Sequence, residues 1–242
     1  MTCIIIPCYN EAIRLPVAAF EAYWQQYPDV RFCFVDDGST DQTRALLERL
    51  QTAHSEQVEV LILPKNEGKA GAVRAGMLHV AQAAQADYVG FLDADLATPL
   101  SAIQDLEARL SGQPSLDLVM GARIKFLGTD IRRNPFRHYA GRVIATLISN
   151  ILKLGVYDTQ CGAKLFRRGV VERLFTEPFL SPWLFDVEML ARLIRQHGRE
   201  GLHNYVAEMP LKQWTEMDDS RIKPSYYFKL WYELYRIRQA YN

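Results

Sequence analysis

The sequence predicts an α/β protein built on a mostly parallel β-sheet with helices on both faces. Short apolar runs alternate with helical patterns at intervals of about thirty residues, which is typical of βαβ units. The first run, residues 3–6, is apolar throughout, as expected for a strand buried on both faces. Polar stretches follow the first, second and fourth runs, at the edge where open α/β sheets bind ligands. The fold class therefore predicts one ligand site at that edge.

The first half of the chain carries the regular part of this pattern. The expected strands are residues 3–6, 32–35, 58–63, 88–92 and 116–120. Four helices are expected between these strands. The first opens at Pro16, the second follows a capping-box pattern of Ser39 and Gln42, the third follows the loop 66–71, and the fourth runs from Pro99 to Leu110. Residues 7–11 and 36–41 are expected to be loops that face the ligand edge.

The alternation is lost after Met120. Residues 121–137 have the composition of a basic loop, and residues 121–142 hold six basic side chains against one acid, Asp130. An apolar helical pattern over 136–154 fits either a core helix or a membrane-surface helix, and it is too short and too polar to span a bilayer.

The last part of the chain predicts three further elements. These are a helix that starts at Trp183, a strand near 210–214, and a C-terminal helix of aromatic and basic residues over 226–238. Aromatic and basic side chains together suit a membrane interface. Dimer packing, or packing within the chain, would give the same pattern.

Composition bounds the function classes. The 242 residues suit one large domain, alone or with an extension, and 49% hydrophobic residues allow a sizeable core. Because 28 basic residues balance 28 acidic ones, the overall charge gives no reason to expect a nucleic-acid partner. The four cysteines lack metal-site or redox spacing, and Cys3 and Cys33 lie in apolar strand-like runs that suit buried free thiols, which fits a reducing compartment. With no signal peptide and no long apolar stretch, a cytoplasmic location is expected.

The pair Asp93 and Asp95 is the strongest chemical signal. It follows the expected strand 88–92 directly, and residues i and i+2 at a strand end point the same way. Two carboxylates that converge repel each other unless a cation lies between them or one is protonated. Mg²⁺ and Mn²⁺ favour such oxygen ligands. An acidic turn without a metal is the alternative interpretation.

Several short motifs stand in the order seen in family 2 glycosyltransferases. They are PCYNE at 7–11, DDGSTD at 36–41, NEGK at 66–69, DAD at 93–95, DTQCGAKLF at 158–166, FDVE at 185–188, WTE at 214–216 and SR at 220–221. The later motifs resemble those of the dolichyl-phosphate β-glucosyltransferases and, more loosely, of the polyprenyl-phosphate mannosyltransferases. Single motifs carry little weight, whereas their shared order over nearly the whole chain is specific.

This resemblance implies a glycosyltransferase A-type, Rossmann-like fold with a C-terminal helical extension. The catalytic domain would span residues 1–215, with a nucleotide-sugar half over about 1–122 and an acceptor half over about 123–215. Residues 216–242 would form a lid and an amphipathic helix. The implied reaction is inverting transfer of a hexose, with glucose favoured, from a nucleotide-diphosphate sugar to a polyprenyl phosphate. The enzyme would act peripherally, at the cytoplasmic face of a membrane.

The resemblance also implies roles for individual residues. Residues expected to bind the nucleotide sugar are Pro7, Tyr9, Glu11, Asp36, Asp37, Gly68, Lys69, Asp93 and Arg221. Asp93 and Asp95 would hold Mg²⁺ or Mn²⁺. From the residues themselves, Asp95, Asp158 and Arg123 are the catalytic candidates, and Asp158 could position the reacting groups, act as a base or cap the following turn. The candidates for the acceptor phosphate are Arg123, Arg132, Arg133 and Lys164. A guanidinium fork suits a phosphate, although any one of these arginines could be a solvated surface residue.

Two departures and several alternatives remain. Ala97 stands where the mannosyltransferases often carry glutamine, and Asp219-Ser220-Arg221 stands where the glucosyltransferases commonly have Gly-Ser-Lys. A hydroxyl acceptor on a saccharide or protein would need a base, which would make Asp158 indispensable. A non-catalytic module that binds sugar nucleotides or membranes is the alternative from another class. A nucleotidyltransferase or a dinucleotide-binding dehydrogenase would need a glycine-rich loop after the first strand, and the sequence has none there.

Overall fold

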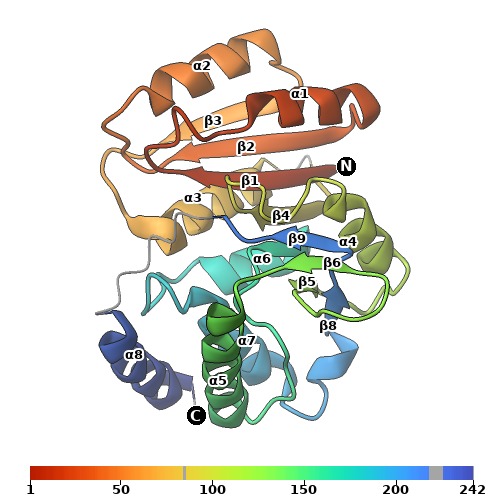
Figure 1. The fold of residues 1–242 in the computed structure, drawn as a ribbon, viewed down its shortest axis with the longest axis vertical. Coiled ribbons are helices and arrows are strands. Elements are labelled where there is room, and N and C mark those ends of the chain that lie inside the picture. Colours follow the sequence, from red (N-terminus) through yellow and green to blue (C-terminus); the bar gives the residue numbers. More distant parts are fainter. Residues whose placement is uncertain (84–85, 218–225, 242) are drawn as a thin grey trace.

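A central sheet organises the computed structural model, which describes residues 1–83, 86–217 and 226–241. Within these residues seven strands form the sheet, in the order β3-β2-β1-β4-β7-β5-β8 (Figure 1). The strands are β1 (Thr2–Cys8), β2 (Val30–Asp36), β3 (Val58–Ile62), β4 (Tyr88–Leu92), β5 (Leu118–Ala122), β7 (Ala163–Arg167) and β8 (Val206–Pro210). Only β7 runs antiparallel to its neighbours β4 and β5. The predicted mostly parallel sheet is confirmed.

Helices cover both faces of the sheet, as predicted. One face carries α1 (Val17–Gln26), α2 (Thr43–Ala53) and α4 (Ala102–Ser111), and the other carries α3 (Gly68–Gln82), α6 (Arg168–Phe175) and α7 (Phe185–His197). Successive side chains of a strand point to opposite faces. Ile4 and Ile6 accordingly pack against the first group of helices and Ile5 against the second. This burial on both faces explains why the strand is apolar throughout.

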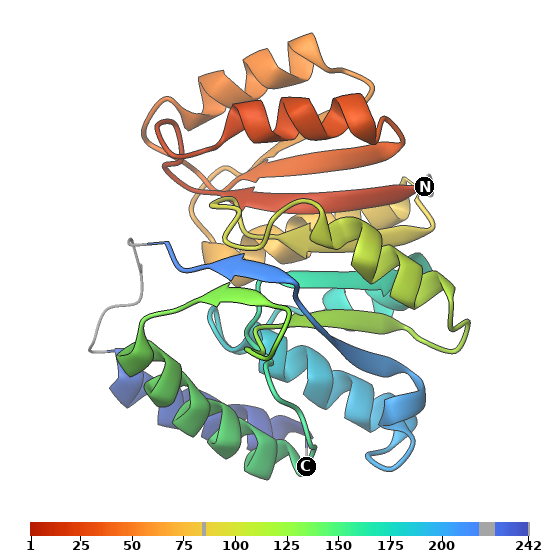
Figure 2. The same cartoon turned by 45° about the vertical axis from the view of Figure 1, so that its right-hand side comes forward.

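The second half of the chain adds elements outside the sheet. The short strands β6 (Asp130–Arg132) and β9 (Gln213–Thr215) pair in parallel, and a 3-10 turn, η1, covers Leu202–Asn204. The helices α5 (Pro135–Leu152) and α8 (Tyr226–Tyr241) lie side by side, away from the sheet edge formed by β3 (Figures 1 and 2). Since β7 lies between β4 and β5, both halves of the chain build the same sheet.

Some local predictions were wrong. The expected capping box does not form, because α2 begins at Thr43 and Ser39 instead accepts a hydrogen bond from the Asn10 N–H. The first strand continues through Pro7 and Cys8, which were expected in a loop. The basic segment after Met120 contains β6 rather than loop alone. The antiparallel strand β7 and the helix α6 were not predicted.

No helix in the described part of the chain combines the length and the apolar character needed to cross a membrane.

Candidate active site

The predicted donor side, formed by the residues expected to bind the nucleotide sugar, lies where β1, β2 and β4 end. In the parallel register Cys8 pairs with Asp36, so the residues after both strands meet at one edge. Asp36 and Asp37 are buried there, and each holds a turn through its carboxylate. Asp36 accepts the Ser39 N–H (3.0 Å) and Asp37 accepts the Glu67 N–H (2.7 Å). Desolvation by burial raises the pKa of Asp37.

The loop after β1 lies against the loop after β2. Asn10 has a left-handed φ of 52°, and its side chain accepts the Thr40 N–H at 2.9 Å. The neighbouring Glu11 donates its N–H to the Thr43 hydroxyl at 2.7 Å. The structure thus brings the predicted nucleoside residues Pro7, Tyr9 and Glu11 to the same edge as Asp36.

The Glu11 carboxylate already has a basic partner in the structure. It is 6% exposed and forms an ion pair with Arg14 at 3.0 Å. A base or ribose at this edge would therefore meet the carboxylate together with the Arg14 guanidinium.

Lys69 and Asp93 join two elements of the donor side. Lys69 lies in the first turn of α3, and its ammonium forms an ion pair with Asp93, just beyond β4. Gly68 begins the same helix with a φ of 77°, a conformation that glycine adopts readily. Exposed backbone N–H groups and a lysine at a helix start form a favourable position for phosphate.

Asp95 lies two residues beyond Asp93, on the turn that follows β4. Its carboxylate accepts the Ala97 N–H at 3.0 Å, and the intervening Leu96 has a left-handed φ of 51°. Desolvation raises the pKa of Asp95, and the negative charge of Asp93 raises it further. The two carboxylates therefore interact unfavourably, and a divalent cation would relieve this repulsion.

The donor atoms fit Mg²⁺ or Mn²⁺. Carboxylate oxygens are the preferred ligands, and Mg²⁺ commonly takes its remaining ligands from water and from substrate phosphates. Among the described residues no group of three or more acidic, histidine or cysteine side chains is placed to hold a metal. A cation at Asp93 and Asp95 would depend on the substrate for part of its coordination.

Gly162, to which the sequence motifs gave no role, shapes this corner of the site. Its carbonyl accepts the Asp93 N–H at 3.2 Å, and a Cβ at this position would overlap the Asp93 carboxylate. Only a glycine allows this approach. The signal in the sequence is a glycine between two residues of an otherwise buried segment, and its target lies 69 positions earlier in the chain.

On the predicted acceptor side, Arg123 and Asp158 form a pair. The guanidinium donates to both carboxylate oxygens at 2.7 and 2.8 Å, and the Arg123 N–H donates to the same carboxylate at 3.0 Å. Burial alone would raise the pKa of Asp158, but the charge and hydrogen bonds of Arg123 lower it to about 2. The Trp214 ring lies 5.2 Å from the guanidinium carbon.

Arg133 lies within reach of the charges of this pair, whereas its neighbour Arg132 is in a different setting. Arg132 is exposed and pairs with Asp130 at 2.9 Å. Arg133 is half-buried against α5, where a Cβ on Gly141 would come within 2.6 Å of its guanidinium. Desolvation and then the like charge of Arg123 lower the pKa of Arg133. In the described part of the chain no hydrogen bond or ion pair engages the Arg133 guanidinium.

Lys164 differs from these arginines because it is fully buried. It is 1% exposed, its ammonium pairs with Asp186 at 2.6 Å, and it donates to the Cys161 carbonyl at 2.7 Å. A buried ammonium with two partners inside the protein is poorly placed to reach an acceptor phosphate. The role predicted for Lys164 therefore has to be reconsidered. The predicted Arg221 lies outside the described residues.

Glu208, on β8, is a second residue that the sequence motifs missed. Its carboxylate accepts the N–H groups of Tyr157 at 2.8 Å and of Asp158 at 2.7 Å. Arg142 stacks on the Tyr157 ring, 3.7 Å from its centroid, and donates to the Tyr157 carbonyl. The segment that carries Asp158 is thus fixed from two sides.

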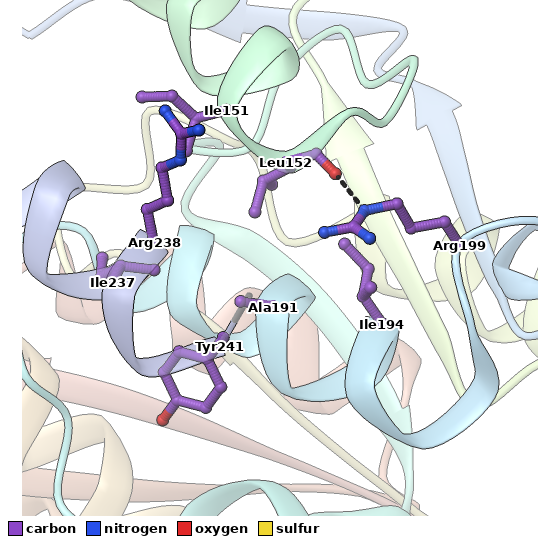
Figure 3. A pocket seen from close by; sticks show the side chains of 8 residues that line it. All are labelled: Ile151, Leu152, Ala191, Ile194, Arg199, Ile237, Arg238 and Tyr241. Atoms are coloured by element: carbon purple, nitrogen blue, oxygen red, sulfur yellow. Dashed lines mark hydrogen bonds between the residues drawn. The ribbon is translucent and has the colours of Figure 1, made fainter.

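A small pocket lies between α5, α7 and α8 (Figure 3). Its lining includes Ile151, Ile194 and Ile237, and Arg199 donates to the Leu152 carbonyl beside it. Apart from Arg199, which follows α7, these residues belong to the C-terminal halves of the three helices, whereas Asp186 and Arg133 lie at or before the N-terminal ends of α7 and α5. None of the predicted site residues lines this pocket.

Comparison with known proteins agrees with this geometry. The model of the family "Glycosyl transferase family 2" matches residues 3–175. The chain is 32% identical to a dolichyl-phosphate beta-glucosyltransferase of Trichomonas vaginalis, over 98% of this chain and 70% of that protein. It is 33% identical to the dolichyl-phosphate beta-glucosyltransferase of Mus musculus, over 91% of this chain and 69% of that protein.

Solved structures share the fold at lower identity. Glucosyl-3-phosphoglycerate synthase from Mycobacterium tuberculosis, in complex with UDP, superposes with a TM-score of 0.66 at 18% identity, over 99% of this chain and 80% of that one. The same enzyme with Mn²⁺, UDP-glucose and phosphoglyceric acid gives a TM-score of 0.65. By its sequence match over most of the chain, this glycosyltransferase belongs to glycosyl transferase family 2.

Proposed function

We propose that the protein transfers glucose, with inversion, from a nucleotide-diphosphate glucose to a polyprenyl phosphate of the dolichyl type. The acceptor half of this proposal rests on the ion pairing of Asp158 and on the neighbouring Arg133. Asp158 is locked onto Arg123 with a low pKa, and the half-buried Arg133 beside it has no partner of its own in the described residues. Such a site favours an anion that needs no deprotonation. The names of the relatives, dolichyl-phosphate beta-glucosyltransferases, support the same reaction.

On the donor side we assign binding and orientation to the residues at the sheet edge. Tyr9, Glu11 and Asp36 would hold the nucleoside, while Lys69 and the start of α3 would hold the diphosphate. A divalent cation at Asp93 and Asp95 would neutralise charge on the departing nucleotide diphosphate. Mn²⁺ is present with UDP-glucose in the glucosyl-3-phosphoglycerate synthase structure, which makes Mn²⁺ and UDP-glucose the first pair to test.

On the acceptor side we assign the phosphate to Arg133 first and to Arg123 second. Within residues 1–83, 86–217 and 226–241 the Arg133 guanidinium has no hydrogen-bond partner, and a bidentate contact would suit the geometry of a guanidinium and a phosphate. Arg123 donates to Asp158 through Nε and Nη2, so it would contribute through its other terminal nitrogen. Arg132 is exposed and already paired with Asp130, and its effect would be small.

The alternative of a hydroxyl acceptor on a saccharide or protein finds less support. Such an acceptor must lose a proton, and a general base works best with a pKa near the operating pH. Asp158, with a pKa of about 2, is far too weak a base for that task. Its part in the proposed reaction is to hold Arg123 in place.

A lipid acceptor requires access to a membrane, and the α5–α8 pair offers a surface for it. Trp231, Tyr232 and Tyr235 on α8 and Tyr139 and Val143 on α5 are exposed. The α5 segment carries Arg137 and Arg142 and no acid. Arg137 pairs with Glu216 and Arg142 stacks on Tyr157, so the exposed aromatic side chains carry this assignment. Such side chains suit the headgroup region of a bilayer. We propose peripheral binding at a cytoplasmic membrane face, with a homodimer as the competing use of this surface.

The test is a product analysis. The purified protein is incubated with a panel of nucleotide sugars, Mn²⁺ and a short polyprenyl phosphate, and products are identified by mass, with EDTA as the metal control. We expect a glucosyl polyprenyl phosphate that forms only with the metal. A product that carries glucose on a saccharide or peptide hydroxyl, or full activity in EDTA, would overturn the corresponding part of the proposal.

A further inference from the structure

A buried ion pair lies behind the donor side of the site, and the reaction described above does not use it. Lys164 on β7 is 1% exposed and Asp186, in the first turn of α7, is 5% exposed. Their charged groups approach to 2.6 Å, and the Lys164 ammonium also lies over the Phe91 ring, 5.4 Å from its centroid. Replacing such a pair by apolar residues is often neutral or stabilising. Stability of the fold is therefore a weak reason for its presence.

The pair lies next to Lys69. The segment that leads into α7 passes close to the start of α3, since a Cβ built on Gly68 would lie 3.7 Å from the Pro182 Cβ. The first turns of α3 and α7, which carry Lys69 and Asp186, are thus neighbours. The sheet also brings the two ion pairs together, because Phe91, which lies under the Lys164 ammonium, is paired with Lys164 in the β4–β7 register and lies two residues before Asp93.

The four charged side chains of the two neighbouring ion pairs balance one another. Two ammonium groups, Lys69 and Lys164, face two carboxylates, Asp93 and Asp186. Lys69 has one carboxylate in direct contact and a second one nearby, whereas Lys164 is fixed by Asp186 and the Cys161 carbonyl. A cation at Asp93 and Asp95 would compete with Lys69 for Asp93. Lys69 then needs another negative charge to remain at the start of α3.

We propose that Asp186, held in place by Lys164, is a positioning residue for Lys69 during donor binding. Its carboxylate keeps the ammonium at the helix start while Asp93 turns to the cation and Lys69 turns to the diphosphate of the donor. Asp186 acts through Lys69 and touches neither the sugar nor the acceptor. The inference rests on the proposed use of a nucleotide-diphosphate donor and is independent of the acceptor.

A second buried pair on the same helix provides a matched control. Glu188 accepts hydrogen bonds from Arg192 at 2.7 Å and from the Tyr241 hydroxyl at 2.8 Å. Arg192 also donates to backbone carbonyls between α6 and α7, including those of Glu177 and Pro178. This pair is as buried as the first, but it faces α8 and the α6–α7 connection instead of the donor side.

The experiment measures binding of UDP with Mn²⁺ by titration calorimetry to folded protein. Removing both charges of the first pair, with Lys164→Met and Asp186→Asn, should weaken UDP binding by about tenfold to a hundredfold, the usual range for groups that orient metal-site residues. The control variant, Arg192→Met with Glu188→Gln, should lower the melting temperature while UDP affinity stays unchanged. Adding the first pair of substitutions to Lys69→Met should produce little further loss, because the effect passes through Lys69.

The outcomes separate the inference from the proposed function. Unchanged UDP affinity in Lys164→Met/Asp186→Asn would overturn the positioning role. So would an equal loss of UDP affinity when the two substitutions are made in wild-type protein and in Lys69→Met. Wild-type protein that binds no UDP with Mn²⁺ would overturn this inference together with the donor half of the proposed function. Wild-type protein that binds UDP but transfers no glucose to polyprenyl phosphate would overturn only the proposed acceptor reaction.

Discussion

At the scale of single residues, the site depends on a few close contacts between residues distant in the sequence, which the sequence alone does not predict. Asp93 reaches its position because Gly162 has no side chain, and Asp158 reaches its position because Glu208 holds its backbone. Both supports are distant in sequence from the groups they serve. The carboxylates could be predicted because they directly follow strands, whereas their supports follow only from the folded arrangement.

The close approach at Gly162 gives the first prediction. In Gly162→Ala the new methyl group would displace the Asp93 carboxylate, and Mn²⁺-dependent UDP binding should fall by about tenfold to a hundredfold. Gly155→Ala is the control, since a Cβ there meets no atom within 4 Å. Calorimetry with both variants checks this. If Gly162→Ala binds UDP as tightly as Gly155→Ala does, the Asp93 carboxylate can move without loss of binding, which would contradict this prediction.

The pair of Asp158 and Arg123 gives a prediction on pH. The pKa of Asp158 falls from an ordinary value of 3.8 to about 2 on folding, so the pair stabilises the fold above pH 4 and loses this contribution as pH falls to about 2. The shift corresponds to about 2 kcal/mol. Urea denaturation of wild-type protein and Asp158→Asn should therefore show a stability difference that shrinks by about this amount between pH 5 and pH 2.

The control for this pH prediction is a surface carboxylate. Asp130→Asn removes the exposed partner of Arg132, and its effect should be small and sensitive to salt. A difference between wild-type protein and Asp158→Asn that stays constant down to pH 2 would contradict the assignment of Asp158 as a deeply paired carboxylate.

At the scale of whole elements, strands with uniform burial were predictable and strands with buried charges were not. Residues of β1 and β2 are almost all buried and apolar, which marks them plainly. The central strand β7 carries Lys164 and Arg167, and these charges can be buried only because Asp186 and the carbonyls of Leu110 and Leu116 receive them. In the sequence the same residues give β7 the composition of a surface segment.

The helix α8 gives a prediction at this scale. Leu230, Leu234 and Ile237 face the core, whereas Trp231 and Tyr235 lie one turn apart on the exposed side, at 56% and 58% exposure. Replacing both aromatic residues by serine should weaken binding to anionic vesicles by about tenfold or more, since each ring contributes apolar area to the interface. Flotation assays at low salt measure this, and the melting temperature should hardly change.

Two results would count against this use of α8. One is unchanged vesicle binding in the double variant, with Ile13→Ser as a control for an exposed apolar residue on the opposite half of the chain. The other is a dimer of the wild-type protein that the two substitutions dissociate. That second result would assign the aromatic surface to an interface between copies of the chain.

At the scale of the whole molecule, the order of the strands explains how distant motifs form one site. The parallel strands β1, β2 and β4 deliver the donor residues to one edge, and β7, inserted in the opposite direction, brings Gly162 beside Asp93. The sequence predicted the parallel half of this arrangement from its regular alternation. It could not predict the insertion of β7, because the connections before and after it follow no repeating pattern.

The most direct test of the central claim compares two acceptors that differ only in the phosphate. The enzyme is assayed side by side with a polyprenyl phosphate and the matching polyprenol, at equal donor concentration and in the same detergent. Charge-assisted hydrogen bonds contribute roughly 1.5–3 kcal/mol each, so losing two should slow the alcohol by about two to four decades. Arg133→Ala should lower the rate with the phosphate while UDP affinity is retained, and Arg132→Ala should change it little. Comparable rates with the alcohol and the phosphate would contradict the account and favour a hydroxyl acceptor.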